Sequence, residues 1–245
     1  MQLPGECRDD RLRGFARRAS CIGAAFHALS YYEEDTGRKA GVTVEPGEAC
    51  RIEIVDEAEC NREVVDRISS SLPRLLGAPL AAEYSCTTGT GDARLLRYRG
   101  LAHALLDSLA TMVLDCLRSL SRRGREHFYI AGWGGEYALG EGGERSVTLP
   151  SVPGVVFIHT HPGTCYPSSK DLQSFADFFS SGGLVEAIVS PSCALALYLE
   201  EPLQEEDYWS LMDAARCVAR SKDGATYADC MNKLFRMRSV KMQLL

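Results

Sequence analysis

This chain contains the stretch Val155-Val156-Phe157-Ile158-His159-Thr160-His161-Pro162, followed by Pro167-Ser168-Ser169-Lys170-Asp171. The apolar run predicts a buried strand, and the polar residues after the loop predict the start of a helix. Side chains alternate between the two faces of a strand, so His159 and His161 point the same way. Two imidazoles and the carboxylate of Asp171 would leave one tetrahedral position free for water, which is the arrangement of a catalytic zinc site.

Each half of this motif also has an ordinary explanation. Histidines whose nitrogens are hydrogen-bonded are common in protein cores. Ser168-x-x-Asp171 is typical of a helix N-terminus, with Ser168 as the cap and Asp171 in the first turn. Here the cap follows the histidine pair after a Pro-Gly turn, and the whole set favours a metal site over a chance arrangement.

Length and composition predict an ordinary globular protein. The 245 residues suffice for one large domain or two small ones, and the composition is 45% hydrophobic and 24% charged. A net charge of -6 gives no broad attraction to nucleic acids or anionic membranes. The polar N-terminus carries no apolar signal segment, and no apolar run reaches the roughly 18 residues of a membrane span. We therefore expect a cytoplasmic protein with no membrane partner.

The ten cysteines admit two interpretations. None of them form a Cys-x-x-Cys pair, so a structural zinc ribbon has no support. We expect them to be small buried hydrophobes in a reducing cytosol. The alternative is a set of intracellular disulfides, which are rare outside hyperthermophiles. A thermophile source is compatible with the scarcity of asparagine, which occurs only at Asn61 and Asn232, and with a preponderance of Arg among the basic residues.

Hydrophobic periodicity predicts an α/β chain of the α+β type. We expect helices at residues 11–32, 61–76, 101–123 and 169–180, strands at 51–55, 127–133, 155–161, 184–190 and 194–199, and two helices in the tail from 205 to 245. This pattern divides the chain into an N-terminal α+β region (1–100), a unit that carries the motif (101–200) and a C-terminal helical extension (201–245).

The motif resembles the signature of the JAMM (MPN+) metalloproteases, the zinc isopeptidases of the proteasome lid and of endosomal deubiquitination. The resemblance rests on His159-x-His161-Pro162 and Ser168-x-x-Asp171, and it covers roughly residues 101–200. It implies an MPN-like curved β-sheet flanked by helices, here with an N-terminal α+β extension. Six residues separate His161 from Ser168, where eukaryotic members usually have seven, so the chain looks more like a prokaryotic member. It also lacks obvious long insertions of the kind that grip linked ubiquitins.

The resemblance also implies a role for each site residue. His159, His161 and Asp171 would bind Zn²⁺, and Glu126, at the start of the strand after the first helix of this unit, would activate the zinc-bound water. Ser168 matches the serine that hydrogen-bonds the oxyanion. In chemical terms the set is coherent, because zinc lowers the pKa of bound water and a carboxylate can take its proton.

Two assignments stay open at this point. The sequence alone does not distinguish Glu126 from the other glutamates in or beside the following hairpin, which are Glu136, Glu141 and Glu144. We favour Glu126, because a strand start is held by the sheet whereas hairpin tips are mobile. Cys165 could compete with Asp171 as third ligand, since a thiolate suits zinc, but a packed or disulfide-bonded cysteine is the simpler expectation.

The function expected from this pattern is that of a zinc-dependent isopeptidase or peptidase. It would hydrolyse the bond at the C-terminal tail of a ubiquitin-like modifier or sulfur-carrier protein, whose extended tail can add to a sheet edge. The alternative is a non-catalytic MPN-type scaffold for protein–protein assembly, but such a domain would have a broken ligand set. The absence of a concentrated basic stripe argues against a nucleic-acid partner, and a homodimer remains open.

Overall fold

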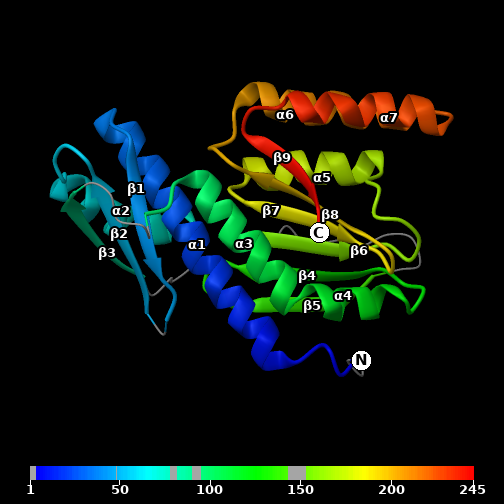
Figure 1. Ribbon diagram of the computed structural model, residues 1–245, viewed down its shortest axis with the longest axis horizontal. Coiled ribbons are helices and arrows are strands. Elements are labelled where there is room, and N and C mark those ends of the chain that lie inside the picture. Colours follow the sequence, from blue (N-terminus) through cyan, green and yellow to red (C-terminus); the bar gives the residue numbers. More distant parts are fainter. Residues whose placement is uncertain (1–3, 48, 78–81, 90–94, 143–152) are drawn as a thin grey trace.

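The computed structural model describes residues 4–47, 49–77, 82–89, 95–142 and 153–245. These residues form two mixed β-sheets surrounded by α-helices (Figure 1). The mixed α/β class expected from the periodicity is therefore confirmed.

The smaller sheet lies in the N-terminal part of the chain. Its strand order is β1-β2-β3, with β1 and β2 antiparallel and β2 and β3 parallel. The strands are β1 (Ala40–Glu45), β2 (Cys50–Asp56) and β3 (Ala82–Thr88), and the sheet is flanked by α2 (Arg62–Leu75). Helix α2 begins where the Asn61 side chain accepts a hydrogen bond from the Val64 amide, which is the expected N-cap interaction.

The larger sheet has the strand order β5-β4-β6-β7-β8-β9. Only the β6–β7 pair is parallel, and its crossover contains α5. The strands are β4 (His127–Gly132), β5 (Tyr137–Glu141), β6 (Gly154–Thr160), β7 (Val185–Val189), β8 (Ala194–Leu199) and β9 (Val240–Leu244). Every residue of β6, β7 and β8 is buried, which explains their almost continuous apolar sequence.

Helices cover both faces of this sheet (Figure 1). One face packs against α1 (Asp9–Thr36), α3 (Tyr98–Met112) and α4 (Leu114–Ser121), while α5 (Ser169–Ser180) covers the other. A further layer, α6 (Glu205–Arg220), packs on α5 and is followed by α7 (Gly224–Asn232) and the 3₁₀ turn η1 (Lys233–Arg236). Helix α1 ends at Gly37, whose positive φ of 67° closes the C-terminus. The Tyr129 hydroxyl joins the sheet to α1 by donating to the Leu12 carbonyl.

Two sequence expectations differ from the structure. The single helix expected at 101–123 is two helices, bent by 54° at Val113. Both halves face the core, so the apolar stripe continues through the bend and periodicity cannot reveal it. The tail has the two expected helices, but its last residues form β9, which pairs with β8 at the edge of the large sheet.

All ten cysteines are paired in disulfides. The expectation of small reduced cysteines is therefore wrong, and the disulfide alternative describes the structure. The pairs are Cys7–Cys116, Cys21–Cys50, Cys60–Cys86, Cys165–Cys193 and Cys217–Cys230. Sequence spacing could not show this, because ten cysteines allow many connectivities and the paired cysteines lie from 13 to 109 residues apart in the chain.

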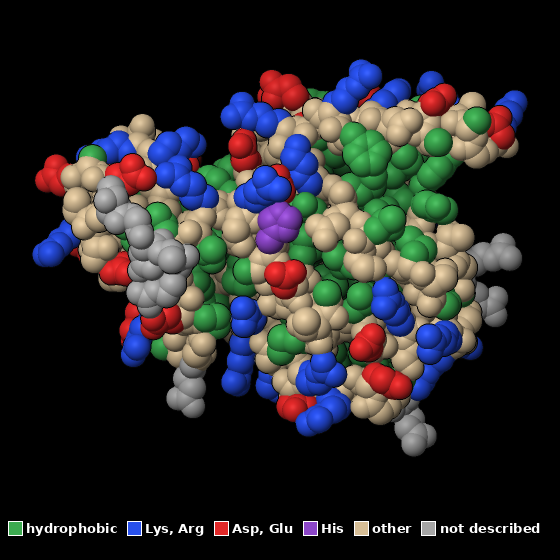
Figure 2. Space-filling model, viewed as in Figure 1, with side chains coloured by type: hydrophobic (Ala, Val, Ile, Leu, Met, Phe, Trp, Pro, Cys, Tyr) green, Lys and Arg blue, Asp and Glu red, His purple; other side chains and the backbone are tan. Residues whose placement is uncertain are grey.

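Among the described residues no single helix has the length and apolar character to cross a membrane. The bent pair α3 and α4 reaches the required length and composition only together. Residues such as Leu105 and Leu109 in α3 are fully buried in the protein core. On the face shown in Figure 2, basic and acidic side chains are interspersed over the described residues.

Candidate metal centre

Strand β6 delivers the two histidines to the α5 face of the large sheet. His159 lies in β6 and is 5% exposed, and His161 follows the strand directly. The His161 amide donates to the Val189 carbonyl at 2.9 Å, so pairing with β7 continues beyond the end of β6. Because side chains two residues apart share a face, both imidazoles point toward the start of α5.

Asp171 stands in the first turn of α5 and is held there by a complete capping box. The Ser168 amide donates to Asp171 Oδ2 at 2.6 Å, and the Asp171 amide donates to Ser168 Oγ at 3.2 Å. The helix cap, which is the ordinary explanation of Ser168-x-x-Asp171, is thus present. It also fixes the direction of the carboxylate, so capping and metal binding are compatible in this structure.

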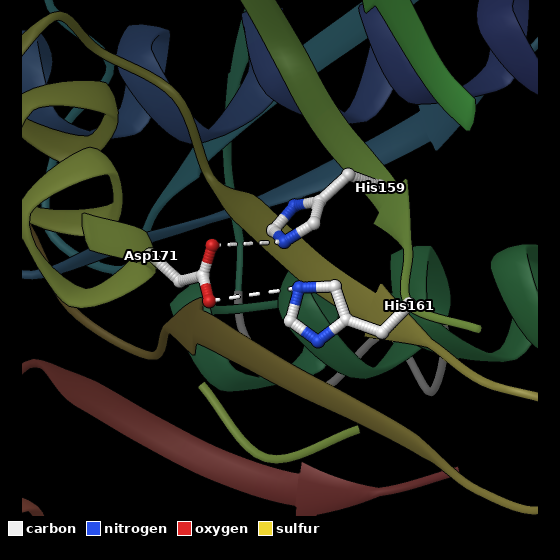
Figure 3. A group of neighbouring side chains, drawn as sticks. All are labelled: His159, His161 and Asp171. Carbon is white, nitrogen blue, oxygen red and sulfur yellow. Dashed lines mark ion pairs between the residues drawn. The ribbon is translucent and has the colours of Figure 1, made fainter. Parts of the chain in front are cut away.

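The three side chains converge on one point (Figure 3). His159 Nε2 lies 3.1 Å from Asp171 Oδ1, and His161 Nε2 lies 3.6 Å from Asp171 Oδ2. One ligand atom from each of the three residues lies within 4.8 Å of the other two. This spacing could hold a metal ion, and two imidazoles with one carboxylate are a ligand set that zinc accepts.

The hydrogen bonding of the two imidazoles supports this fit. His161 Nδ1 is 3.1 Å from the Thr164 carbonyl, so Nδ1 carries the proton and Nε2 presents its lone pair to the centre. Metal-binding histidines are usually oriented by such a bond from the other ring nitrogen. Both ring nitrogens of the buried His159 lack a hydrogen-bond partner among the described residues, and Nε2, which lies 3.1 Å from Asp171 Oδ1, is the nitrogen that faces the centre. A buried polar atom without a partner is costly, and a metal ion would satisfy this nitrogen.

Local charges favour the ligand forms of these groups. Burial alone would raise the pKa of Asp171, but the His159 ring and the hydrogen bonds from Ser168 outweigh it and hold that pKa at about 2. Burial, followed by the neighbouring His159, lowers the pKa of His161. An ionised carboxylate and a neutral imidazole are the forms that bind metal.

The low pKa of Asp171 predicts a specific loss of stability in acid. In the folded protein this pKa lies below the ordinary value of 3.8, so the carboxylate stabilises the fold above about pH 4 and loses that effect as the pH falls to about 2. The shift corresponds to about 2 kcal/mol. Denaturant unfolding measures the free energy of unfolding of the metal-free wild type and of metal-free Asp171→Asn. We expect the difference between these two free energies to shrink as the pH falls through this interval. A difference that stays constant would contradict the assignment.

Glu126 lies on the face of the large sheet that carries the two histidines. It directly precedes β4, whose Phe128 pairs with His159, so Glu126 shares the face of the two histidines. Its side chain is half-buried. Burial raises its pKa, the nearby His159 lowers it and Asp171 raises it again, so the carboxyl lies within electrostatic reach of two ligands. This shift brings the pKa of the carboxyl closer to the value of an effective general base at neutral pH.

The other glutamates considered from the sequence lie elsewhere. Glu136 is exposed at the β4–β5 turn, where its side chain folds over Gly132, at the end of the sheet opposite the histidines. Glu141 is paired with Arg125, with 2.6 Å between Oε1 and Nη1. Glu144 lies outside the described residues.

Ser168 is the N-cap of α5, and Cys165 lies in the loop that precedes this helix. Ser168 is exposed beside Asp171, and its Oγ accepts the capping bond from the Asp171 amide. Cys165 is joined to Cys193, so it offers no thiolate to compete with Asp171 as ligand.

One further acidic residue on this face of the sheet is not part of the motif. Glu186, in β7, pairs with Phe157 and therefore lies on the same face as His159. Its side chain is completely buried, its Oε1 accepts from the Ser174 hydroxyl at 2.9 Å, and its Oε2 has no hydrogen-bond partner among the described residues. Burial raises its pKa well above the ordinary value. A lone glutamate in the apolar run from Leu184 to Val189 was the signal for such a residue.

In comparisons with known proteins, no family model, no curated protein and no solved structure matches this chain.

Proposed function

We propose that this protein is a zinc-dependent isopeptidase or peptidase of the JAMM type. It would hydrolyse the bond at the C-terminal tail of a ubiquitin-like modifier or sulfur-carrier protein. We also propose that the large sheet is the curved β-sheet of an MPN-like fold. The observation that carries it is the convergence of His159, His161 and Asp171 around one point, with the carboxyl of Glu126 on the same face of the sheet and within electrostatic reach of His159 and Asp171.

The chain's own residues supply the steps of such a hydrolysis. When held by His159, His161 and Asp171, a zinc ion supplies Lewis acidity that brings the pKa of a water molecule toward neutrality. Glu126 takes a proton from the attacking water and passes it to the leaving amine. The Ser168 hydroxyl donates a hydrogen bond to the carbonyl oxygen as negative charge develops on it.

The expected substrate matches the surroundings of the centre. Strand β5 is an edge of the large sheet and pairs with β4, the strand that follows Glu126, so an extended tail has a sheet edge near the site. The net charge of -6 favours a protein over a nucleic acid as partner. A homodimer is a further arrangement that solution size measurements would test.

Cleavage of a fusion between a ubiquitin-like modifier and a second protein tests the proposed activity. We expect the zinc-loaded protein to release the modifier, a chelator to stop the reaction, and added zinc to restore it. Zinc binding without cleavage of any modifier fusion would contradict the peptidase and support the non-catalytic scaffold. Absence of zinc binding would contradict both metal-dependent activity and the ligand assignment.

Replacement of Ser168 separates its two roles. Ser168→Ala and Ser168→Gly both remove the oxyanion donor, so we expect kcat to fall by about 100-fold or more in each while zinc stays bound. The lost cap should cost about 1 kcal/mol of stability in Ser168→Ala but only a few tenths in Ser168→Gly. Steady-state kinetics and denaturant unfolding measure the two effects. Activity that follows stability across the pair would contradict the catalytic role.

We further propose that the protein works in the cytoplasm. Its five disulfides then favour an organism whose cytoplasm allows disulfides to persist. Intracellular disulfides persist in hyperthermophiles, whereas most other cells keep cytosolic thiols reduced. The paucity of asparagine agrees with that source. A thermal midpoint typical of a mesophile protein, roughly 45–65 °C, would argue against it.

A further inference from the structure

The loop of residues 162–167 connects His161 to Ser168 and so controls the relative position of the ligands on β6 and α5. It is attached at several points. The Thr164 carbonyl accepts from His161 Nδ1, and Cys165 is joined to Cys193. A third attachment comes from the C-terminal segment, because the Tyr227 hydroxyl in α7 donates to the Pro167 carbonyl at 2.9 Å.

The third attachment reaches the metal centre through a single peptide group. The carbonyl of the Pro167–Ser168 peptide accepts from Tyr227, and the amide of the same peptide donates to Asp171 Oδ2 at 2.6 Å. Oδ2 is the carboxylate oxygen that faces His161 Nε2. Because a peptide group is planar and rigid, fixing its carbonyl also fixes the direction of its N–H. Hydrogen bonds in such a chain also polarise one another.

The surroundings of Tyr227 hold it in this position. Its ring packs edge-on against Tyr166, with 6.0 Å between the ring centres and 63° between their planes. The disulfide Cys217–Cys230 ties α7 to α6, which packs on α5. Burial, followed by the charge of Asp171, raises the pKa of Tyr227 to about 12, so its hydroxyl remains a donor at physiological pH.

We propose that Tyr227 is a positioning residue of the metal centre. Its hydroxyl orients the Pro167–Ser168 peptide, which in turn holds the carboxylate of Asp171 in the direction required of a ligand. The C-terminal segment then helps to set the geometry of the metal centre. This inference rests on the proposed function, since it requires that the centre binds a metal ion.

Tyr227→Phe tests this role, because it removes only the hydroxyl and keeps the ring against Tyr166. The matched control is Tyr208→Phe, a second tyrosine of the C-terminal segment, whose hydroxyl makes only a 3.5 Å contact with Asp177 on α5. The probes are Zn²⁺, whose affinity is measured by competition with a chelator, and Co²⁺, whose visible spectrum reports the geometry of its ligands. Thermal unfolding of the metal-free proteins shows whether both variants remain folded.

We expect Tyr227→Phe to weaken zinc binding by about 10- to 100-fold and to alter the Co²⁺ spectrum, as loss of a group that orients a ligand typically does. Tyr208→Phe should match wild type in both. Wild-type affinity and spectrum in Tyr227→Phe would overturn the positioning role and leave the proposed function intact. An equal loss of zinc affinity in both variants would indicate general destabilisation and would also overturn the positioning role. Failure of wild type to bind either metal would overturn the proposed function itself.

Discussion

Replacing Asp171 by asparagine is expected to remove zinc from the protein while the fold persists. The asparagine side chain retains an oxygen that can accept the Ser168 amide, so the first turn of α5 keeps its cap. A neutral amide is a much weaker zinc ligand than a carboxylate, and the negative charge that stabilises the ion is lost. Loss of an outer partner alone costs about 10- to 100-fold in metal affinity, and loss of a direct ligand should exceed that range.

Elemental analysis after dialysis against a weak chelator measures this loss. The control is Asp177→Asn, an exposed aspartate of the same helix that makes no contact with the histidines in the described structure. We expect Asp177→Asn to retain zinc like wild type. Full zinc occupancy in Asp171→Asn would show that Asp171 is a cap only and would remove it from the ligand set.

Replacing Glu126 by glutamine is expected to abolish most of the activity without loss of metal. Glutamine has nearly the same shape but cannot take a proton, and removal of a general base typically costs about 10²- to 10⁴-fold in rate. Glu126 is not among the three ligand residues, so zinc content should equal that of wild type. The expected change is therefore in kcat, measured on a modifier fusion at saturating substrate.

Glu136→Gln is the matched control for this change. Glu136 lies at the far end of the same hairpin and is exposed. We expect it to keep wild-type kcat. If Glu126→Gln kept wild-type kcat while Ser168→Gly lost activity, the proton would have to be moved by another group. The buried Glu186 would then be the next candidate to replace.

The local elements of the site were predictable because their signals are local. The apolar run before His159 predicted the buried strand, and Ser168-x-x-Asp171 predicted the start of α5. The alternation of side chains along a strand was sufficient to place His159 and His161 on one face. These three parts needed no knowledge of the rest of the chain.

The parts that depend on long-range contacts could not be predicted in this way. The position of Glu126 on the face of the histidines depends on the pairing of Phe128 with His159, which no spacing in the sequence reveals. The attachment of Tyr227 to Pro167 crosses from α7 to the loop before α5. The strand β9 was missed because its sequence, Val-Lys-Met-Gln-Leu, is short and acquires its partner β8 only in the folded sheet.

The central claim is that His159, His161 and Asp171 together bind one zinc ion. A crystal of zinc-loaded protein, measured on both sides of the zinc absorption edge, tests it most directly. We expect one anomalous peak, about 2.0–2.2 Å from His159 Nε2, His161 Nε2 and an oxygen of Asp171. A zinc-saturated crystal with no peak between these residues, or with its zinc bound elsewhere, would contradict it.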